Sequence, residues 1–361
     1  MTTEQILKKL ITFKTISKNH EENDACLSWI KKQTKSLPIF TTGIRRQSFP
    51  SVVVTTRKTK RPAIWLVAHI DVVPGAASSF IPKQKGNRLY GRGTFDMKFA
   101  VACYIKLLQD LGSDLPRCNF GIMLTSDEEV GGANGAKYLV DKGYRSNVVI
   151  LPDGGADWKI EKGAKGVLQL RVVSRGVSGH GSRPWSGRNA IVTLAEFLLL
   201  LQKEFVAEPC RDTMHRHATC NIGKIEGGAA INQIPDYAMA HVDIRLTSEK
   251  ERKIVEKIVF TLQKRYKGIR VETEATGKSY QFDLGLPYFK RFSEVARKKY
   301  GIRTGSVFSH GSSDARFFAE KGIPVISTRP KGGGHHSERE WIDTTDLNRF
   351  YEVLKDFVKL F

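Results

Sequence analysis

Apolar runs and helical periodicities alternate along the first part of the chain. Continuous apolar runs at 63–70, 120–125 and 148–151 are typical of strands that are buried on both faces. Between these runs, residues 99–111 and 135–142 carry apolar side chains at helical spacing. Strands that alternate with helices in this way predict an α/β fold with a mostly parallel sheet.

The pattern changes near residue 166. Residues 167–174 alternate apolar and polar, as in a sheet with one solvated face. The segments that follow predict a helix, two strands, a helix and a strand, which complete a small α+β unit. Their ranges are 189–204, 219–224, 238–246, 249–266 and 269–273.

The α/β pattern resumes after residue 288, with a helix that reaches residue 300 and a strand at 324–327. A chain of 361 residues is long enough for two domains. We therefore predict one domain that comprises residues 1–166 and 283–361, and a second domain, residues 167–282, that is inserted into the first.

The composition, with 40% hydrophobic and 26% charged residues, is that of a soluble globular protein. The net charge of +21 raises the question of a nucleic-acid partner. Lysines and arginines are spread along the chain, however, without a basic block that is interleaved with aromatic residues. We therefore expect no nucleic-acid partner. The positive field would instead attract acidic substrates.

The five cysteines are odd in number and form no CxxC pair, which argues against a disulfide framework and for a reducing compartment. This also argues against a thiolate zinc site, so a metal would be held by histidines and carboxylates. The N-terminal segment lacks the apolar core of a signal peptide, and no apolar run reaches membrane-spanning length. We expect a cytoplasmic protein with no membrane partner.

Histidines and acidic residues follow the predicted strands. His69 and Asp71 lie at the end of the first, residues 127–129 (Asp-Glu-Glu) at the end of the second, and Asp153 at the end of the third. Because ligands of open α/β sheets bind outside the carboxyl ends of the strands, these groups are expected to face one crevice. Carboxylates that face one another repel unless cations neutralise them, so a metal site is predicted.

Two further groups join this set: Asp96 in a glycine-rich loop before a helix, and His336 after the last strand. Imidazole and carboxylate ligands suit zinc, and cobalt or manganese also fit. Asp96 is a candidate bridge between two metals, because no second acidic residue flanks it. The adjacent Glu128 and Glu129 indicate that one binds metal while the other moves protons.

Each of these signals has an ordinary explanation when it stands alone. A His-x-Asp pair occurs by chance on surfaces, a Glu-Glu pair is usually solvated, and an aspartate before two glycines is usually a turn residue. Their joint placement at strand ends favours a site, because solvated residues need not share one edge of a sheet.

Seven segments then carry a specific family resemblance over essentially the whole chain. In order, they are AHIDVVPG, LYGRGTFDMK, TSDEEVGG, SGHGSRP, INQIPD with the later DIR, GSSDARF and GHHSERE. They resemble the family of succinyl-diaminopimelate desuccinylase, acetylornithine deacetylase, glutamate carboxypeptidase and aminoacylase. The resemblance implies a zinc-peptidase-like α/β catalytic domain with helices on both faces of a mostly parallel sheet, and an inserted α+β lid and dimerisation domain.

The implied activity is metal-dependent hydrolysis of amide bonds in small peptides or N-acyl amino acids, with two Zn²⁺ per subunit. Glu128 would take a proton from a metal-activated water and pass it to the leaving amine, and Asp71 would fix the tautomer of His69. The ligand sets implied by the resemblance are His69, Asp96 and Asp153 for the first zinc, and Asp96, Glu129 and His336 for the second.

The resemblance also implies a homodimer that is joined through the inserted domain. His180 would reach the active site of the partner subunit and stabilise an oxyanion there. Asn232, Arg245 and Arg316 would hold the substrate, with the arginines aligned on its carboxylate.

Two features of the family pattern leave alternatives: which of two adjacent histidines is the ligand, and which branch of the family Asp153 resembles. His335 competes with His336, but the family places a glutamate four residues after the ligand, and Glu340 stands four after His336. Asp153 stands where the desuccinylase and carboxypeptidase branches usually have glutamate, and an aspartate there resembles the di- and tripeptidase branches. This favours a peptidase and leaves a desuccinylase or acetylornithine deacetylase-type deacylase as the alternative.

Three rival hypotheses make different predictions. A related zinc aminopeptidase without a lid would lack the inserted unit and the SGHGSRP segment. A non-catalytic metal-binding scaffold would not need Glu128. A basic nucleic-acid binder would show salt-sensitive retention on DNA.

Overall fold

The computed structural model describes residues 1–205 and 217–361. Contacts between Cα atoms divide the chain into two units. The larger unit comprises Met1–Lys162, Phe282–Ser309 and Ser313–Phe361. The smaller unit comprises Gly163–Gln281 and His310–Ser312.

A six-stranded mixed sheet forms the centre of the larger unit, in the order β1-β2-β6-β3-β7-β17. Neighbours among β6, β3, β7 and β17 run parallel, whereas β1 and β2 pair antiparallel at one side of the sheet. The strands are β1 (Phe40–Arg46), β2 (Phe49–Thr55), β3 (Ile64–His69), β6 (Phe120–Thr125), β7 (Val148–Ile150) and β17 (Val325–Ile326).

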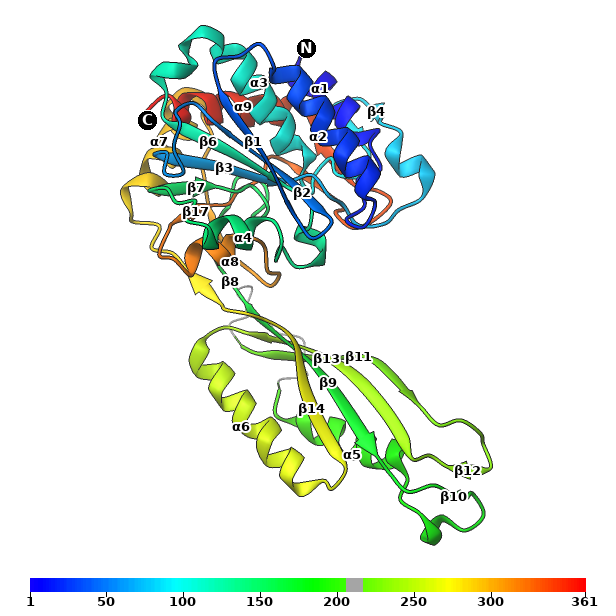
Figure 1. The fold of residues 1–361 in the computed structure, drawn as a ribbon. Coiled ribbons are helices and arrows are strands. Elements are labelled where there is room, and N and C mark those ends of the chain that lie inside the picture. Colours follow the sequence, from blue (N-terminus) through cyan, green and yellow to red (C-terminus); the bar gives the residue numbers. More distant parts are fainter. Residues whose placement is uncertain (206–216) are drawn as a thin grey trace. The chain divides into compact units, whose positions relative to one another are not determined.

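Helices cover both faces of this sheet. Figure 1 shows α1, α2, α3 and α9 on one face, and α4 and α8 on the other. Every residue of β3 is buried, as the continuous apolar run predicts. The fold is therefore of the predicted α/β class. The helices are α1 (Thr3–Ile11), α2 (His20–Thr34), α3 (Lys98–Leu111), α4 (Ala136–Asp141), α7 (Pro287–Tyr300), α8 (Ala315–Ala319) and α9 (Thr344–Val358).

Close packing between neighbouring strands leaves no space for a side chain at Gly121. A Cβ atom there would overlap the ring of Trp65, whose residue pairs with Gly121 across β3 and β6. The indole Nε1 of Trp65 donates a hydrogen bond of 2.9 Å to the carbonyl oxygen of Arg145. The core thus fixes the parallel strands whose ends carry the candidate ligands.

Short strands form further sheets outside the six-stranded one. An antiparallel sheet has the order β18-β19-β5-β4, and a three-stranded sheet has the order β15-β8-β16. Their bounds are β4 (Lys83–Lys85), β5 (Arg88–Tyr90), β18 (Gly332–Gly333), β19 (Trp341–Asp343), β8 (Ile160–Ala164), β15 (Tyr280–Gln281) and β16 (Ser306–Ser309).

The smaller unit contains an antiparallel sheet, β11-β13-β9-β14, packed against two helices. Alternate residues of β13 are buried, which leaves one face of the strand for the helices. The pair β10 and β12 forms a separate short ladder. The elements are β9 (Gly166–Arg175), β10 (Gly179–His180), α5 (Ala190–Lys203), β11 (Thr219–Gly227), β12 (Gln233–Ile234), β13 (Tyr237–Leu246), α6 (Glu249–Arg265) and β14 (Ile269–Gly277).

In the described part of the chain, no helix is long and apolar enough to cross a membrane. Cys26, Cys103, Cys118 and Cys220 are free thiols. Cys210 lies outside the described residues.

Candidate metal centre

The carboxyl ends of the parallel strands bring the candidate ligands together. His69 is the last residue of β3, Glu129 lies in a 3-10 turn after β6, and Asp153 follows β7. Because β6, β3 and β7 are parallel neighbours, these side chains emerge at one edge of the sheet. Asp96 reaches the same place from the loop before α3, and His336 from the loop between β18 and β19.

The five side chains form two triads that share one carboxylate. In the first, Nε2 of His69 lies 3.4 Å from Oδ1 of Asp96 and 3.8 Å from Oδ1 of Asp153. In the second, Nε2 of His336 lies 3.2 Å from Oδ2 of Asp96 and 3.2 Å from Oε2 of Glu129. The candidate ligand atoms within each triad lie within 4.8 Å of one another. The two oxygens of Asp96 thus face different triads.

The donor set fits divalent cations. Nε2 of His69 and Oδ1 of Asp96 are buried and have no hydrogen-bond partner among residues 1–205 and 217–361. Buried polar atoms without partners are costly, and coordination to a cation would satisfy both. Two imidazoles and three carboxylates without thiolate form a donor set typical of zinc, cobalt or manganese.

The orientation of His69 is set mainly by a main-chain carbonyl. Its Nδ1 lies 2.9 Å from the carbonyl oxygen of Asp71 and 3.5 Å from Oδ1 of the same residue. A proton on Nδ1 directs the lone pair of Nε2 toward the triad. The closer partners of the Asp71 carboxylate are the Ser17 hydroxyl at 2.7 Å and the N–H groups of Glu128 at 3.2 Å and Glu129 at 3.1 Å. Asp71 therefore also anchors the turn that carries both glutamates.

The loop that carries Asp96 is held by the buried carboxylate of Glu340. Oε1 of Glu340 accepts hydrogen bonds from the N–H groups of Phe95 at 2.8 Å and Asp96 at 3.0 Å. Oε2 accepts from the N–H of Gly93 at 3.0 Å and from the Arg92 guanidinium at 3.1 Å. The sequence pattern indicates Glu340 only as a spacing marker for His336, whereas the structure gives it a positioning contact of its own.

One buried cation, which the sequence analysis did not predict, lies beside the first triad. Nη2 of Arg329 donates a 2.9 Å hydrogen bond to Oδ1 of Asp153 and lies 3.9 Å from Oδ1 of Asp96. Its guanidinium carbon lies 4.9 Å from the centroid of the Phe95 ring. The available signal was position alone, because Arg329 follows β17 at the same edge of the sheet.

Of the two adjacent histidines, His336 lies with the carboxylates. His336 adopts φ 63°, a left-handed conformation that is uncommon for residues other than glycine. The His335 ring lies 5.5 Å from the His336 ring and 6.2 Å from the Phe95 ring. Burial lowers the pKa of His335, whereas hydrogen bonds to Asp96 and Glu129 raise the pKa of His336 to about 10.

The carboxylates shift the pKa values of their neighbours. Burial, followed by the negative charge of Asp153, raises the pKa of Glu128 well above its ordinary range. Burial favours the neutral form of His69, but the nearby carboxylates of Asp153, Asp71 and Asp96 outweigh it and raise its pKa. Since the same carboxylates would attract a cation, metal binding would compete with these protons.

The remaining predicted residues lie in different parts of the molecule. His180 and Asn232 are exposed and close together in the smaller unit, because β10 pairs with β12 and the Gly181 N–H donates to the Asn232 carbonyl. Arg245 lies near the far end of β13 and pairs with Asp243 at 2.8 Å. In the larger unit, Arg316 donates hydrogen bonds to the carbonyl oxygens of Ser313 and Gly131.

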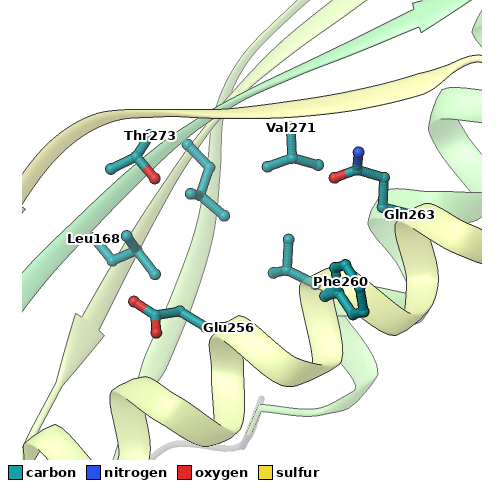
Figure 2. Close-up of a pocket in the computed structure, with 8 residues that line it drawn as sticks. Leu168, Glu256, Phe260, Gln263, Val271 and Thr273 are labelled. Carbon is teal, nitrogen blue, oxygen red and sulfur yellow. The ribbon is translucent and has the colours of Figure 1, made fainter.

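A cavity of about 140 Å³ in the smaller unit is separate from all of these residues. Figure 2 shows it between α6 and the sheet, with Phe260 on the helix and Val271 on β14 among the residues that line it. Glu256 is its one acidic lining residue, and neither histidine nor cysteine lines it. The cavity therefore offers no cluster of candidate metal ligands.

Histidine and carboxylate triads that share an aspartate, with a further glutamate beside them, are typical of hydrolases that activate water with metal ions. The model of peptidase family M20/M25/M40 matches residues 65–360. The chain belongs to this family and is a hydrolase of amide bonds, which confirms the predicted family and enzyme class.

Relatives of known name agree with this class. A succinyl-diaminopimelate desuccinylase from Sulfurovum sp. is 24% identical, over 100% of this chain and 99% of that protein. A tripeptidase from Staphylococcus aureus has a TM-score of 0.79 at 20% identity, and the match covers 99% of this chain and 97% of that chain. A metallo-carboxypeptidase from Sulfolobus solfataricus has a TM-score of 0.80 at 19% identity, with 99% and 98% covered. The two structural matches support the fold.

Proposed function

We propose that this protein is a cytoplasmic di-zinc hydrolase that cleaves amide bonds in small peptides or N-acyl amino acids. The observation that carries the proposal is the shared carboxylate, because Asp96 presents one oxygen to each of two histidine-containing triads. Cobalt or manganese could occupy the same donors. The first cation would be held by His69, Asp96 and Asp153, and the second by Asp96, Glu129 and His336.

Two divalent cations at these positions would polarise the substrate carbonyl and lower the pKa of a water molecule. Glu128 is an acidic group that belongs to neither triad and directly precedes Glu129, a residue of the second triad. Its backbone N–H is held by the Asp71 carboxylate, so its side chain is directed by the same turn that places Glu129. Glu128 would accept the proton of the attacking water and deliver it to the leaving nitrogen.

We further propose a homodimer in which His180 acts in the active site of the partner subunit. Tyr237 begins β13 and Arg245 is its penultimate residue, and the two are about 26 Å apart at the usual rise of a strand. His180 lies beyond the end at which Tyr237 pairs with Arg175. One small substrate is too short to contact both His180 and Arg245 of the same subunit. In a dimer, His180 of one subunit and Arg245 of the other could contact the same substrate.

Exposed apolar residues on the smaller unit supply a surface for such a dimer. On α5, the exposed fractions are 37% for Ile191, 52% for Val192 and 58% for Leu199. Ile225 on β11, which α5 contacts, is 55% exposed. Apolar side chains that gather on one helix and its neighbouring strand are typical of protein interfaces. This surface supports dimerisation through the smaller unit.

The substrate is proposed to carry a carboxylate, for which Arg245 and Arg316 are candidate partners. Asp153 favours a peptidase by resemblance to the di- and tripeptidase branches. The second candidate is desuccinylation of succinyl-diaminopimelate, which is favoured by the full-length similarity to a desuccinylase of that name.

A substrate panel tests the proposal and separates the two candidates. The protein is stripped with a chelator, reloaded with zinc and assayed against dipeptides, tripeptides, N-acyl amino acids and succinyl-diaminopimelate. We expect zinc-dependent release of an amine from one class, with loss of turnover in Glu128→Gln. Turnover that survives chelation, or that Glu128→Gln leaves unchanged, would contradict the proposed chemistry.

A further inference from the structure

Arg329 is a buried cation in direct contact with the first triad. Its side chain is 8% exposed and lies over the ring of Phe95. Its carbonyl oxygen accepts a 3.0 Å hydrogen bond from the N–H of Trp158, which fixes the backbone next to the triad. The guanidinium is therefore held by the fold at the edge where the metal ligands converge.

The guanidinium shares the oxygen atoms that the first cation would use. Oδ1 of Asp153 lies 2.9 Å from Nη2 of Arg329 and 3.8 Å from Nε2 of His69. Oδ1 of Asp96 lies 3.9 Å from the same Nη2 and 3.4 Å from Nε2 of His69. Both carboxylate oxygens that face His69 thus also face a fixed positive charge.

The second triad has no such neighbour. In the described ranges, 1–205 and 217–361, no lysine or arginine forms an ion pair with Glu129, and Oδ2 of Asp96 pairs with His336 alone. With neutral histidines, the first set of ligands and Arg329 carry a net charge of minus one. The second set carries minus two. The two sets contain the same types of donor. Within the described residues, an arginine forms an ion pair with carboxylate oxygens of the first set and none does so with Glu129 or with Oδ2 of Asp96.

A guanidinium cannot relieve this difference by losing its proton, because it stays charged in proteins. In a buried site with little water, repulsion between a divalent cation and a fixed positive charge is weakly screened. The hydrogen bond to Oδ1 of Asp153 also occupies part of the electron density that a cation would need from that oxygen. Both effects lower the affinity of the first triad for a cation.

We propose that Arg329 makes the two metal positions unequal, with a tight position at Asp96, Glu129 and His336 and a weak, exchangeable position at His69, Asp96 and Asp153. The inference rests on the proposed metal-dependent function. It adds that the weak position fills only at higher free metal concentration. An activity that needs both cations would then follow metal availability.

Metal binding to the stripped protein tests the inference without reference to turnover. Zinc is titrated against a competing chelating dye, and bound zinc per chain is measured after dialysis at fixed free zinc. The wild-type protein is expected to bind two equivalents in steps that differ in affinity by at least tenfold. Arg329→Met should tighten the weaker step by at least tenfold, and Arg329→Gln provides a second neutral replacement.

Two further sets of variants locate the effect. Arg88→Met is the matched control, because the Arg88 guanidinium lies 4.1 Å from the Trp341 ring but is exposed and pairs with no candidate ligand. Its two zinc affinities should equal those of the wild type. His336→Ala should remove the tight step, and His69→Ala should remove the weak one. Thermal unfolding of each stripped variant verifies that it is folded.

The outcomes separate a failure of this inference from a failure of the proposed function. Equal affinities in the wild type would overturn the inference, as would a weaker step that neither Arg329→Met nor Arg329→Gln tightens. Loss of the tight step in His69→Ala would also overturn it. All three results would leave a metal-dependent hydrolase in place. A wild-type chain that binds no zinc in the titration would overturn both the inference and the proposed function.

Discussion

The candidate metal centre and the substrate residues of the smaller unit are built in opposite ways. In the centre, carboxylates have neighbours that fix them, such as Ser17 on Asp71 and Arg329 on Asp153. In the smaller unit, His180 and Asn232 are exposed, and the His180 ring forms hydrogen bonds with the neighbouring Ser182. Groups that activate water must be preorganised, whereas exposed groups need another surface to complete their site.

The largest expected effect breaks the chemistry of the centre while leaving its geometry intact. Glu128→Gln should lower kcat by about 10³- to 10⁴-fold, because an amide cannot accept the proton of the attacking water. Zinc content should stay at the wild-type level, since Glu128 is in neither triad. Turnover and bound zinc are measured on the same sample. Near-normal turnover would assign the proton transfer to another group.

The second prediction concerns the preorganisation of Asp96. Glu340→Ala removes the acceptor of three backbone N–H groups and leaves the Arg92 guanidinium buried without this partner. We expect a loss of roughly 3–5 kcal/mol in the free energy of unfolding, together with weaker zinc binding. Denaturant unfolding in the presence of chelator measures the first quantity. The exposed neighbour Glu338→Ala is the control, and an equal effect of both variants would refute the specific role of Glu340.

The strands that carry the metal centre can be predicted from the sequence, because each strand has a local pattern of apolar residues. The runs that become β3, β6 and β7 are buried and mostly apolar, and the polar residues at or just after the end of each run lie at the sheet edge by topology. The hairpin of β1 and β2 was not predicted. β1 is exposed along most of its length, so its residues show no apolar periodicity.

Arg329 shows why the rest of the site could not be predicted. A single arginine after a strand has no spacing signature, and its effect depends on which carboxylate it meets across the fold. Its sequence separation from Asp153 is 176 residues, so only the tertiary structure brings the two together. The contacts of Glu340 with the loop of Asp96 are likewise long-range, at a separation of 244 residues.

The third prediction uses the pH dependence of stability to test whether the Asp314 carboxylate is shielded from water. Asp314 is buried, and Oδ1 has no hydrogen-bond partner in the part of the chain described. Burial, with Asp127 adding to it and Arg316 opposing, raises its pKa from 3.8 to about 7. The folded state therefore binds more protons than the unfolded state between these values. The stability from this group is complete below about pH 4 and is lost as pH rises through 7.

Asp314→Asn should remove this loss, because the amide stays neutral. In zinc-free protein, the variant should gain stability relative to the wild type as pH rises from about 4 to 7, by up to roughly 4 kcal/mol, and then stay level. Chemical unfolding at a series of pH values measures the difference. The exposed Asp283→Asn should show no comparable trend. A flat difference for Asp314→Asn would show that its carboxylate is well solvated.

The smallest effect tests whether the exposed residues of the smaller unit complete a site in a second subunit. His180→Ala should lower kcat by about 10²-fold, the usual loss for one oxyanion donor, with zinc content unchanged. This substitution alone does not distinguish action within a subunit from action across a dimer. Mixing it with Glu128→Gln does, because the two defects then lie on different chains.

In a heterodimer with exchange between subunits, one site carries both defects and the other carries neither. Equal mixing should therefore restore about a quarter of wild-type activity, since half of the dimers are mixed and each has one intact site. Exchange is verified by differently tagged chains. If His180 acts within its own subunit, every site keeps one defect and no activity returns. A strictly monomeric active enzyme would refute the dimer as well, and would place the exposed residues of α5 outside any obligatory interface.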